Sequence, residues 1–548
     1  MTENTQTENI NDQIEPTPIT SQQNSQTPKQ TITPKQTITP KQTITPKQTI
    51  HVDPYLNAPM DLGTPAGKGI VYKVITNDVI RYMQGGVATT TGDQYPRLFK
   101  DGIYPQEEGE LVLSKIIYDL GEDRGVVLSP EHVSNVMKRL KVETYVPLAQ
   151  CEPDADHVIV VQNGILDVCT GVLTPHDPKK VYFSKIPVAW DPNAPYPTMF
   201  HTYMDQTVKG VEWEKDVIQE MIGYMLYRQY TFHLMYFLIG NGSNGKGTLI
   251  RIIEQLLGKE NICSMQLHDI NNPKSEFLLA ALQGKLANLC GETKQTNILS
   301  AENIKMATGE DELETRQPYG RSFRFRSHAK MVFSANRVPS TSDFTDGFKR
   351  RLVILDFPNK ISGSATIRGI EQKMENCGEL PGILLWAVEG LQRMLRLDKT
   401  SYGRSIAMNG IIYDMKSHPI RYFVRDMIDH EFGKRTMKIS IEEAYMIYAQ
   451  ENLLPTLTSE ELHHEFVAEC NAISMNVRQI QARASQLCKD DQATLKTQGK
   501  RPSYRPYAYE NVVLRYPQGH TPTTWEEKEN RYKAKMKHLW DEEQKKII

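Results

Sequence analysis

The sequence predicts an α/β protein in which a P-loop core follows an N-terminal α/β domain and precedes a mostly helical C-terminal domain. Three observations support this fold class. An apolar run at 234–239 leads directly into a glycine-rich loop, and a stretch with helical periodicity at 246–257 follows that loop. Residues 211–228 place their apolar side chains on one helical face. Further short apolar runs have the length of buried parallel strands.

The remaining core elements follow from the same patterns. Apolar runs bounded by polar residues predict strands, and apolar residues spaced by three or four positions predict helices. We expect strands at 285–290, 323–326, 329–335 and 352–357, and helices at 300–307 and 383–396.

The composition is that of a globular protein with several domains. A chain of 548 residues is too long for one core and predicts two to four domains. The net charge of −2 gives no overall attraction to nucleic acid, so such binding must come from local basic patches. Seven cysteines occur without a C-x-x-C pair, which argues against zinc or redox motifs and fits a reducing compartment. Because the sequence holds no apolar run long enough to span a bilayer, we expect a cytoplasmic protein with no membrane partner.

Composition also divides the chain into segments. The hexapeptide TPKQTI occurs four times in tandem within the first 50 residues, which are polar and contain no aromatic residue. Such a stretch cannot bury enough apolar surface to fold, so we expect a disordered tail. The predicted segments are this tail at 1–65, an N-terminal α/β domain at 66–205, the core with the glycine-rich loop at 206–400, a helical domain at 411–520 and a charged tail at 521–548.

Local signals predict some elements outside the core. Two apolar runs on either side of Gln162-Asn163-Gly164 predict a β-hairpin with an Asn-Gly turn. Ser440-x-x-Glu443 and Thr458-x-x-Glu461 each have the pattern of a capping box that opens a helix.

The glycine-rich loop predicts a site for ATP and Mg²⁺. Backbone N–H groups can converge on phosphate oxygens where side chains do not obstruct them, and the following helix adds its positive N-terminal dipole. We expect Lys246 to reach the β- and γ-phosphates. Gly247 stands where Ser or Thr is usual, so Thr248 is the expected magnesium ligand. The loop consists of Gly240, Asn241, Gly242, Ser243, Asn244, Gly245, Lys246, Gly247 and Thr248.

Two later strands end in polar residues of the kind that ATP hydrolysis requires. Glu292 follows the strand at 285–290 and would bind magnesium through water or polarise the attacking water. Asn336 follows the strand at 329–335 and would orient water against the γ-phosphate.

The segment between these two strands predicts a basic β-hairpin with its tip at 319–321. Its basic residues alternate with aromatic ones, and no acid occurs from Arg316 to Lys330. Tyr319, Arg321 and Arg324 are therefore candidates for binding a nucleic-acid strand. An edge strand kept soluble by arginines would give the same pattern, and the sequence alone leaves both interpretations open.

Arg350 and Arg351 precede the strand at 352–357. A guanidinium in this position can act as an arginine finger that one subunit delivers to the γ-phosphate of its neighbour. A surface basic pair is the alternative.

Taken in order, these motifs resemble the superfamily 3 helicases, a ring-forming branch of the AAA+ ATPases. More narrowly, the chain is similar to the poxvirus-type primase-helicase group of phages, plasmids and integrated mobile elements. QNGILDV at 162–168 and VAWDPNAPYP at 188–197 resemble the domain that precedes the ATPase in that group. The similarity covers about residues 150–400, and a weaker one extends from Tyr445 to Phe466.

The resemblance implies an AAA+ ATPase that forms a hexameric ring and threads single-stranded DNA from a fork through its pore. It makes Glu292 the catalytic carboxylate, Asn336 the γ-phosphate sensor, and Arg350 or Arg351 the finger, without choosing between the two arginines. Many relatives have two acids where this chain has Gly291 and Glu292, which puts the magnesium-binding role of that strand in doubt.

Two further patterns bear on function. Asp154-x-Asp156 could bind metal in a primase, but no second acidic cluster accompanies it, and we interpret it as a loop. The basic, aromatic stretch from Thr497 to Tyr507 is either the wing of a winged-helix module that binds origin DNA or a proline-rich surface loop.

The function that we expect is therefore an ATP-dependent DNA helicase that works with other replication proteins. Two alternatives remain. One is a replication initiator that uses ATP for assembly without unwinding. The other is a nucleotide kinase, since G-K-G-T also occurs in that class.

Overall fold

The computed structural model describes residues 60–515, apart from 92, 94, 106–108, 153–155, 209–211, 273–276, 293–300, 317–321, 342–343, 362–368, 499 and 501–504. These residues belong to one compact unit, Asn57–Ile548. The TPKQTI repeats, the tail at 521–548, Asp154 and the hairpin tip with Tyr319 and Arg321 lie outside the described residues. The predictions made for them stay predictions.

The N-terminal part begins with helices. Thr64 caps the first of them by accepting a hydrogen bond from the Gly67 N–H, and a proline at the helix start suits the fixed φ of that residue. The Asp78 carboxylate in this helix is nearly buried and pairs with Arg124 at 2.6 Å, which ties the first helix to the end of the second. The elements are α1 (Pro65–Tyr82), β1 (Val87–Ala88), β2 (Arg97–Leu98), α2 (Gly109–Asp123) and α3 (Pro130–Glu143).

The predicted hairpin at 158–168 is confirmed, but its glycine has a different role. Strands β3 (Val158–Val161) and β4 (Gly164–Asp167) pair antiparallel, and β5 (Leu173–Thr174) pairs with β4. Gly164 lies opposite Val161 within the ladder, so it is a strand residue and not part of the turn. A Cβ atom on Gly164 would come within 2.5 Å of the Thr174 carbonyl oxygen, so the close approach of β5 explains the glycine.

A parallel five-stranded sheet forms the centre of the fold, in the order β12-β6-β11-β8-β7. Every residue of β6, β8, β11 and β12 is buried, as expected for a parallel sheet that is covered on both faces. The sheet strands predicted from the apolar runs are present, as β6 (Met235–Ile239), β8 (Ala287–Cys290), β11 (Lys330–Ala335) and β12 (Leu352–Asp356). The edge strand β7 (Ile262–Cys263) has only two residues and was not predicted.

Two apolar cores lie on opposite faces of this sheet. Tyr236 and Leu238 of β6 belong to a core with the helices around the P-loop, whereas Phe237 belongs to a core that continues into the C-terminal helices. Five helices contribute to the first of these cores, namely α4 (Thr198–Thr207), α5 (Glu212–Met225), α6 (Lys246–Leu257), α10 (Ile370–Asn376) and α11 (Leu380–Leu397). The sheet region also has three short helices, α7 (Leu267–Ile270), α8 (Glu302–Ala307) and α9 (Asp346–Lys349). The predicted helices at 211–228, 246–257, 300–307 and 383–396 are thus confirmed, with small changes at their ends.

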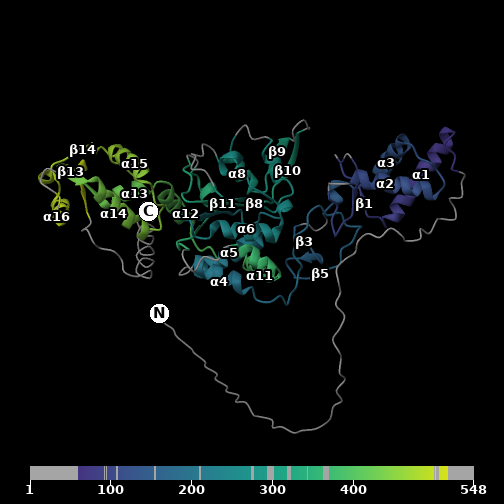
Figure 1. Ribbon diagram of the computed structural model, residues 1–548, viewed down its shortest axis with the longest axis horizontal. Coiled ribbons are helices and arrows are strands. Elements are labelled where there is room, and N and C mark those ends of the chain that lie inside the picture. The colour runs from purple at the N-terminus through teal and green to yellow at the C-terminus, as the bar shows by residue number, and fades with distance from the viewer. Residues whose placement is uncertain are drawn as a thin grey trace, which may run out of the picture. The chain divides into compact units, whose positions relative to one another are not determined.

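Helices α5 and α11 lie side by side because glycines let their backbones approach (Figure 1). A Cβ atom on Gly223 would come within 2.1 Å of the Ala387 carbonyl oxygen, and one on Gly390 would clash with Gln219. The predicted hairpin between the core strands is also present, with β9 (Glu312–Arg316) antiparallel to β10 (Ser322–Arg326).

The C-terminal part is helical with a small sheet that the sequence did not predict. An antiparallel sheet in the order β13-β15-β14 packs with the helices. Its longest strand, IDHEFGKRTM, is mostly polar and exposed, so it carries no apolar run that periodicity could detect. The elements are α12 (Ile406–Ser417), α13 (Pro419–Met427), β13 (Ile428–Met437), α14 (Lys438–Glu451), α15 (Ser459–Ala472), β14 (Gln479–Gln481), α16 (Lys489–Thr497) and β15 (Tyr507–Leu514).

Of the two predicted capping boxes, one is present. Thr458 and Glu461 make reciprocal side-chain contacts at the start of α15. The prediction for Ser440 is wrong, because α14 already begins at Lys438. Ser440 is buried in the first turn and donates a hydrogen bond to Asp491 at 2.6 Å, so a tertiary contact satisfies its hydroxyl. In the part of the chain that the structure describes, no helix is long and apolar enough to cross a membrane.

Candidate nucleotide-binding site

The glycine-rich loop connects β6 to α6 and is shaped by two of its glycines. A Cβ atom on Gly240 would lie 1.9 Å from Asn244 Nδ2 and 2.6 Å from the Phe357 carbonyl oxygen. Gly245 has a φ of 90° and lies against Thr207, so an L side chain would be strained there for two reasons. The sequence pattern is therefore a requirement of this backbone path.

Neighbouring elements hold the loop in place. The Asn244 side chain donates a hydrogen bond to the Phe357 carbonyl at 2.9 Å, which joins the loop to the end of β12. From α4, the Tyr203 hydroxyl donates to the Gly245 carbonyl at 2.8 Å. Tyr203 is buried, so the segment ahead of the core supports the loop directly.

Lys246 lies at the base of the loop and is only 6% exposed. Its ammonium donates hydrogen bonds to the Gly240 carbonyl at 2.6 Å and to Asn244 Oδ1 at 3.0 Å, and lies 3.5 Å from Asn336 Oδ1. Burial lowers the pKa of Lys246 to about 8, and the negative charge of Glu292 opposes that shift. The lysine thus contacts the residue that the sequence assigned to the γ-phosphate.

Four of the predicted site residues, Lys246, Thr248, Glu292 and Asn336, line one cavity of about 370 Å³, whereas Arg350 and Arg351 do not. Lys246 and Thr248 come from the start of α6, while Glu292 and Asn336 follow the carboxyl ends of β8 and β11. Ligands of parallel α/β sheets bind at this edge, outside the carboxyl ends of the strands. The full lining is Gly242, Ser243, Asn244, Gly245, Lys246, Gly247, Thr248, Arg251, Gly291, Glu292, Ser334, Ala335 and Asn336.

The residues present fit a nucleoside triphosphate with Mg²⁺. Thr248 is half-buried in the first turn of α6, and its hydroxyl accepts a hydrogen bond from Arg251 at 3.2 Å. Arg251 in turn pairs with Glu371 of α10 at 2.8 Å. Thr248 and Glu292 would supply oxygen ligands to Mg²⁺, which takes few protein ligands when phosphate oxygens and water complete its shell. Among the described residues, no group of three His, Cys, Asp or Glu could hold a metal ion by itself.

The two candidate finger arginines differ in their surroundings. Arg351 is 5% exposed, and its guanidinium donates to the Thr308 hydroxyl at 2.9 Å and to the Lys305 carbonyl at 3.1 Å. Arg350 is exposed. Both precede β12 and therefore lie at the amino edge of the sheet, about 17 Å along the strand from the carboxyl edge. Neither arginine is positioned to serve the cavity of its own chain.

The described part of the hairpin is less basic than β10 alone suggests. Arg324 is exposed but pairs with Glu314 on the opposite strand at 3.2 Å. The register also places Arg326 opposite Glu312. Acids on β9 therefore offset the arginines of β10, and the predicted DNA-binding tip lies outside the described residues.

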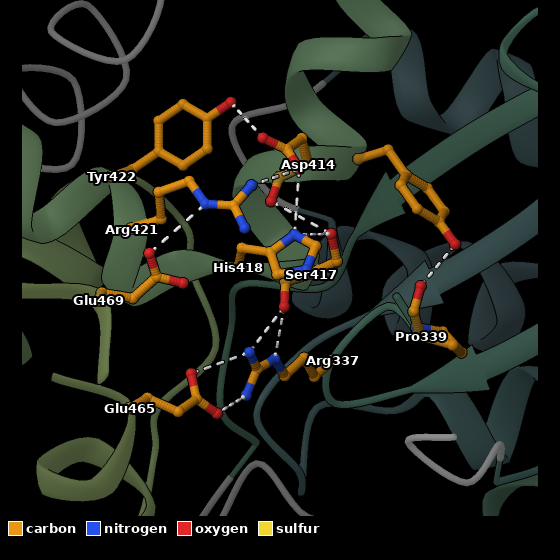
Figure 2. Close-up of polar contacts among 10 residues, drawn as sticks. Arg337, Pro339, Asp414, Ser417, His418, Arg421, Tyr422, Glu465 and Glu469 are labelled. Carbon is orange, nitrogen blue, oxygen red and sulfur yellow. Dashed lines mark hydrogen bonds and ion pairs between the residues drawn. The ribbon is translucent and has the colours of Figure 1, made fainter. Parts of the chain in front are cut away.

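Two residues at this edge, Arg337 and Asn241, make long-range contacts that carried no sequence signal. Arg337, directly after Asn336, makes a bidentate ion pair with Glu465 of α15 at 2.6 and 3.0 Å (Figure 2). The Asn241 side chain, within the loop, contacts the backbone at Leu454 and Thr456. More than 100 residues separate the partners in each case, so no local pattern could have predicted these contacts.

A Ser–His–Asp cluster nearby does not have the geometry of a hydrolytic triad. Ser417 Oγ and Asp414 Oδ1 each lie 3.0 Å from the same atom, Nδ1 of His418. In a triad the serine and the carboxylate use opposite ring nitrogens, so this arrangement cannot relay a proton between them.

Two segments of the chain match known protein families. Residues 97–209 match the family described as D5 N terminal like, and residues 238–351 match a family of unknown function, DUF5906. The second match runs from within β6 to Arg351 and so includes the loop, Glu292 and Asn336. Over the first segment the chain is similar to D5-type proteins.

Solved structures similar to this chain are distant. "The A form apo structure of NrS-1 C terminal region-CTR" is 12% identical, with a TM-score of 0.38, over 63% of this chain and 78% of that one. "The apo structure of NrS-1 C terminal region (305-718)" is 11% identical, with a TM-score of 0.37, over 79% and 98%. A JCV Helicase with a bound acetamide compound is 13% identical, with a TM-score of 0.20, over 40% and 70%.

Proposed function

We propose that this protein is an ATP- and Mg²⁺-dependent DNA helicase of superfamily 3, with an AAA+ core that assembles into a ring. The observation that carries the proposal is the meeting of Lys246, Glu292 and Asn336 in one cavity at the carboxyl edge of the sheet. The D5 N terminal like match in the segment ahead of the core supports it.

The chemistry that we propose uses these residues in separate roles. Lys246 would exchange its contacts with the loop for phosphate oxygens, whose charge its ammonium would offset. Glu292 would accept a proton from the attacking water, and the Asn336 amide would orient that water. Thr248 would hold Mg²⁺, which supplies positive charge to the β- and γ-phosphates. Gly291 adds no second carboxylate, so Glu292 would act without an acidic neighbour.

We further propose that the site is completed by a neighbouring subunit. Arg350 is the better candidate for the finger because it is exposed, whereas Arg351 donates its hydrogen bonds within its own chain. A homo-hexamer would bring Arg350 at the amino edge of one sheet to the cavity of the next. The tip of the β9–β10 hairpin would then grip single-stranded DNA in the pore.

The C-terminal part supports the winged-helix interpretation. Its order is helix α13, strand β13, helices α14 and α15, and strands β14 and β15, with β15 between the other two in the sheet. That is the order of a winged helix, with α16 inserted between the last two strands. We propose that this module binds duplex DNA at an origin, with the 497–507 stretch in its wing.

A strand-displacement assay tests the proposal. Forked DNA with both tails, ATP and Mg²⁺ should yield separated strands with the wild-type chain and none with Lys246→Ala. ATP hydrolysis without separation would favour the initiator alternative. Phosphate transfer from ATP to a nucleoside monophosphate would favour the kinase.

A further inference from the structure

A large cavity lies at the amino edge of the central sheet, away from the glycine-rich loop. Its volume is about 740 Å³, and it shares no lining residue with the cavity at the loop. One wall comes from residues within 228–233, which lie between α5 and β6. A second wall comes from 326–328, where the hairpin strand β10 leads into β11. The third is formed by Cys151, Glu152 and Asp156 in the segment ahead of the core.

Four buried polar atoms that belong to lining residues have no hydrogen-bond partner among the described residues. They are Arg228 Nε, His233 Nδ1, Ser327 Oγ and His328 Nε2. Arg228 and Ser327 are only 9% and 4% exposed. A buried polar group without a partner costs free energy, and native proteins contain few of them. Four around one cavity therefore indicate that a polar ligand or water fills it.

All four atoms are able to donate a hydrogen bond. The Arg228 Nε–H group is only a donor, the Ser327 hydroxyl can rotate to donate, and a neutral histidine donates from one ring nitrogen. Burial lowers the pKa of His233. Burial, together with the charges of Arg228 and Lys330, holds the pKa of His328 well below its ordinary value. Both rings are therefore neutral at about pH 7.

A phosphate group matches these donors better than a single water molecule does. Its several oxygens carry negative charge and accept strong hydrogen bonds, so one group can accept from all four atoms. The Arg228 guanidinium adds a charge of the right sign within the lining. The cavity is also much larger than a phosphate, so a bound phosphate leaves room for an organic group that carries it.

Three carboxylates also line the cavity, and each already accepts from a neighbour. The contacts are Glu152 with Arg228 Nη1 at 2.8 Å, Asp156 with the Gln229 amide at 2.9 Å, and Glu310 with the Tyr230 N–H at 2.7 Å. Carboxylates repel a ligand that is only anionic. A ligand with hydroxyl groups beside its phosphate can donate to their remaining oxygens. Charge and volume together favour a hydroxylated phosphate ester over free phosphate.

We infer that this cavity binds a phosphate monoester that carries hydroxyl groups, such as a sugar phosphate, with Arg228, Ser327 and the two histidines as donors to the phosphate. Because the donors are buried, the phosphate must enter the cavity completely. A terminal phosphate can do so, whereas a phosphate within a DNA strand has chain on both sides. The inference does not depend on the proposed ATP site, since the two cavities share no residue.

A ligand in this place would join three segments of the chain. Arg228 already pairs with Glu152 and donates to Ser184 at 2.6 Å, which ties the connection before β6 to the segment ahead of the core. Contact with Ser327 would add the end of the β9–β10 hairpin. The bound ester would therefore stiffen the base of the hairpin whose tip we propose to grip DNA.

Calorimetric titration of the full chain with ribose 5-phosphate, inorganic phosphate and ribose tests the inference. The chain carries Lys246→Ala, so that the cavity at the glycine-rich loop lacks its cation. At constant ionic strength, we expect ribose 5-phosphate to bind about 3-fold or more tightly than inorganic phosphate, and ribose not to bind. Equal affinities of the two phosphates would overturn the assignment to an ester. No binding of either would overturn the site and leave the cavity to water.

Ser327→Ala removes one proposed donor without removing a hydrogen bond from the folded chain, because this hydroxyl has no partner among the described residues. It should weaken binding of ribose 5-phosphate about 10-fold and leave the melting temperature unchanged or higher. The control is Ser322→Ala, at the exposed start of the same hairpin strand and outside the cavity lining, which should not change the affinity. Unchanged affinity in Ser327→Ala, or equal losses in both variants, would contradict the inference.

Arg228→Lys keeps a positive charge near Glu152 but has no Nε–H group at this position, so it should also weaken binding about 10-fold. Hydrogen exchange then locates the ligand. Ribose 5-phosphate should slow backbone exchange at 228–233 and 326–328 in the wild-type chain and not in Arg228→Lys. Protection confined to the loop at 240–248 would place the phosphate in the proposed ATP site and overturn the inference. If Arg228→Lys proves unstable, Ser327→Ala serves in its place.

Discussion

Each end of the central sheet carries a buried lysine, and the two lysines have different surroundings. Lys246 at the carboxyl edge is 6% exposed and lines an open cavity, whereas Lys330 at the amino edge is fully buried. Burial lowers the pKa of both side chains. A buried lysine with a lowered pKa is therefore not by itself the mark of a functional site, and access to a cavity is what separates the two.

The contacts of Lys330 explain why it is sealed. Its ammonium donates to the Tyr227 and His328 carbonyls at 2.6 and 2.9 Å, and lies 4.4 and 4.5 Å from the ring centroids of Tyr224 and Tyr230. Backbone oxygens and aromatic faces satisfy the charge without leaving room for a ligand. Arg350 and Arg351, which precede β12 two strands away from β11, show the same division, since only the first is exposed.

The largest effect should come from removing the lysine in the open cavity. Lys246→Ala is expected to lower ATP hydrolysis at least about 1000-fold, because the loop keeps its shape but loses the cation that offsets phosphate charge. Steady-state phosphate release measures this. Circular dichroism should show an unchanged fold, and hydrolysis within a factor of two of wild type would remove the basis for the assignment.

The next largest effect should separate the two arginines. Arg350→Ala is expected to lower ATP hydrolysis about 1000-fold with an unchanged melting temperature, as for loss of an arginine finger. Arg351→Ala should lower the melting temperature, because it removes three hydrogen-bonding contacts within the chain, one of them buried.

Mixing inactive subunits sharpens the comparison. Arg350→Ala subunits keep an intact P-loop, and Lys246→Ala subunits keep an intact Arg350. An equimolar mixture should regain part of the ATPase activity at the mixed interfaces. No recovery, in subunits shown to co-assemble, would argue that Arg350 does not act across an interface.

The sealed lysine should affect stability and not catalysis. Lys330→Ala is expected to reduce the free energy of unfolding by about 2–5 kcal/mol, since it leaves a cavity and two buried carbonyls without their donor. Urea denaturation measures the change. ATP hydrolysis per folded molecule should stay within about twofold of the wild-type rate. A loss of hydrolysis with normal stability would show that Lys330 acts in catalysis and not in stability.

Local patterns predicted the parts of this fold that depend on neighbouring residues. The P-loop, its flanking strand and α6 follow from glycines and apolar periodicity, and the structure has α6 at the predicted residues. Glu292 and Asn336 could be placed because a strand that ends in a polar residue delivers it to the shared edge of a parallel sheet.

Contacts between distant segments could not be predicted in this way. The contacts of Asn241 with the backbone of Leu454 and Thr456, and the Arg337–Glu465 pair, depend on how the C-terminal helices pack against the sheet. The choice between Arg350 and Arg351 depends on the buried Thr308 hydroxyl, which accepts from the second. Ser440 shows the converse, because its local capping pattern gave a wrong prediction and its hydroxyl instead donates to the distant Asp491 carboxylate.

The smallest effect concerns the proton on Lys246. Its pKa of about 8 in the folded chain lies below the ordinary value of 10.5, so the unfolded chain binds more protons between these two pH values. The contribution of Lys246 to stability therefore rises as pH increases from about 8 to 10.5. Triphosphate oxygens in the cavity favour the charged form, so ATP binding should raise this pKa and take up a proton at alkaline pH.

Calorimetry in buffers of different ionisation enthalpy measures that uptake. At pH 9 wild type should bind most of one proton per ATP, and at pH 7 almost none, because a group with a pKa of about 8 is already charged there. Lys246→Arg keeps a cation that stays protonated across this range and should remove the uptake at pH 9. Equal uptake in this variant would assign the proton to another group, whereas no uptake in wild type would mean that the free lysine is fully charged despite its burial.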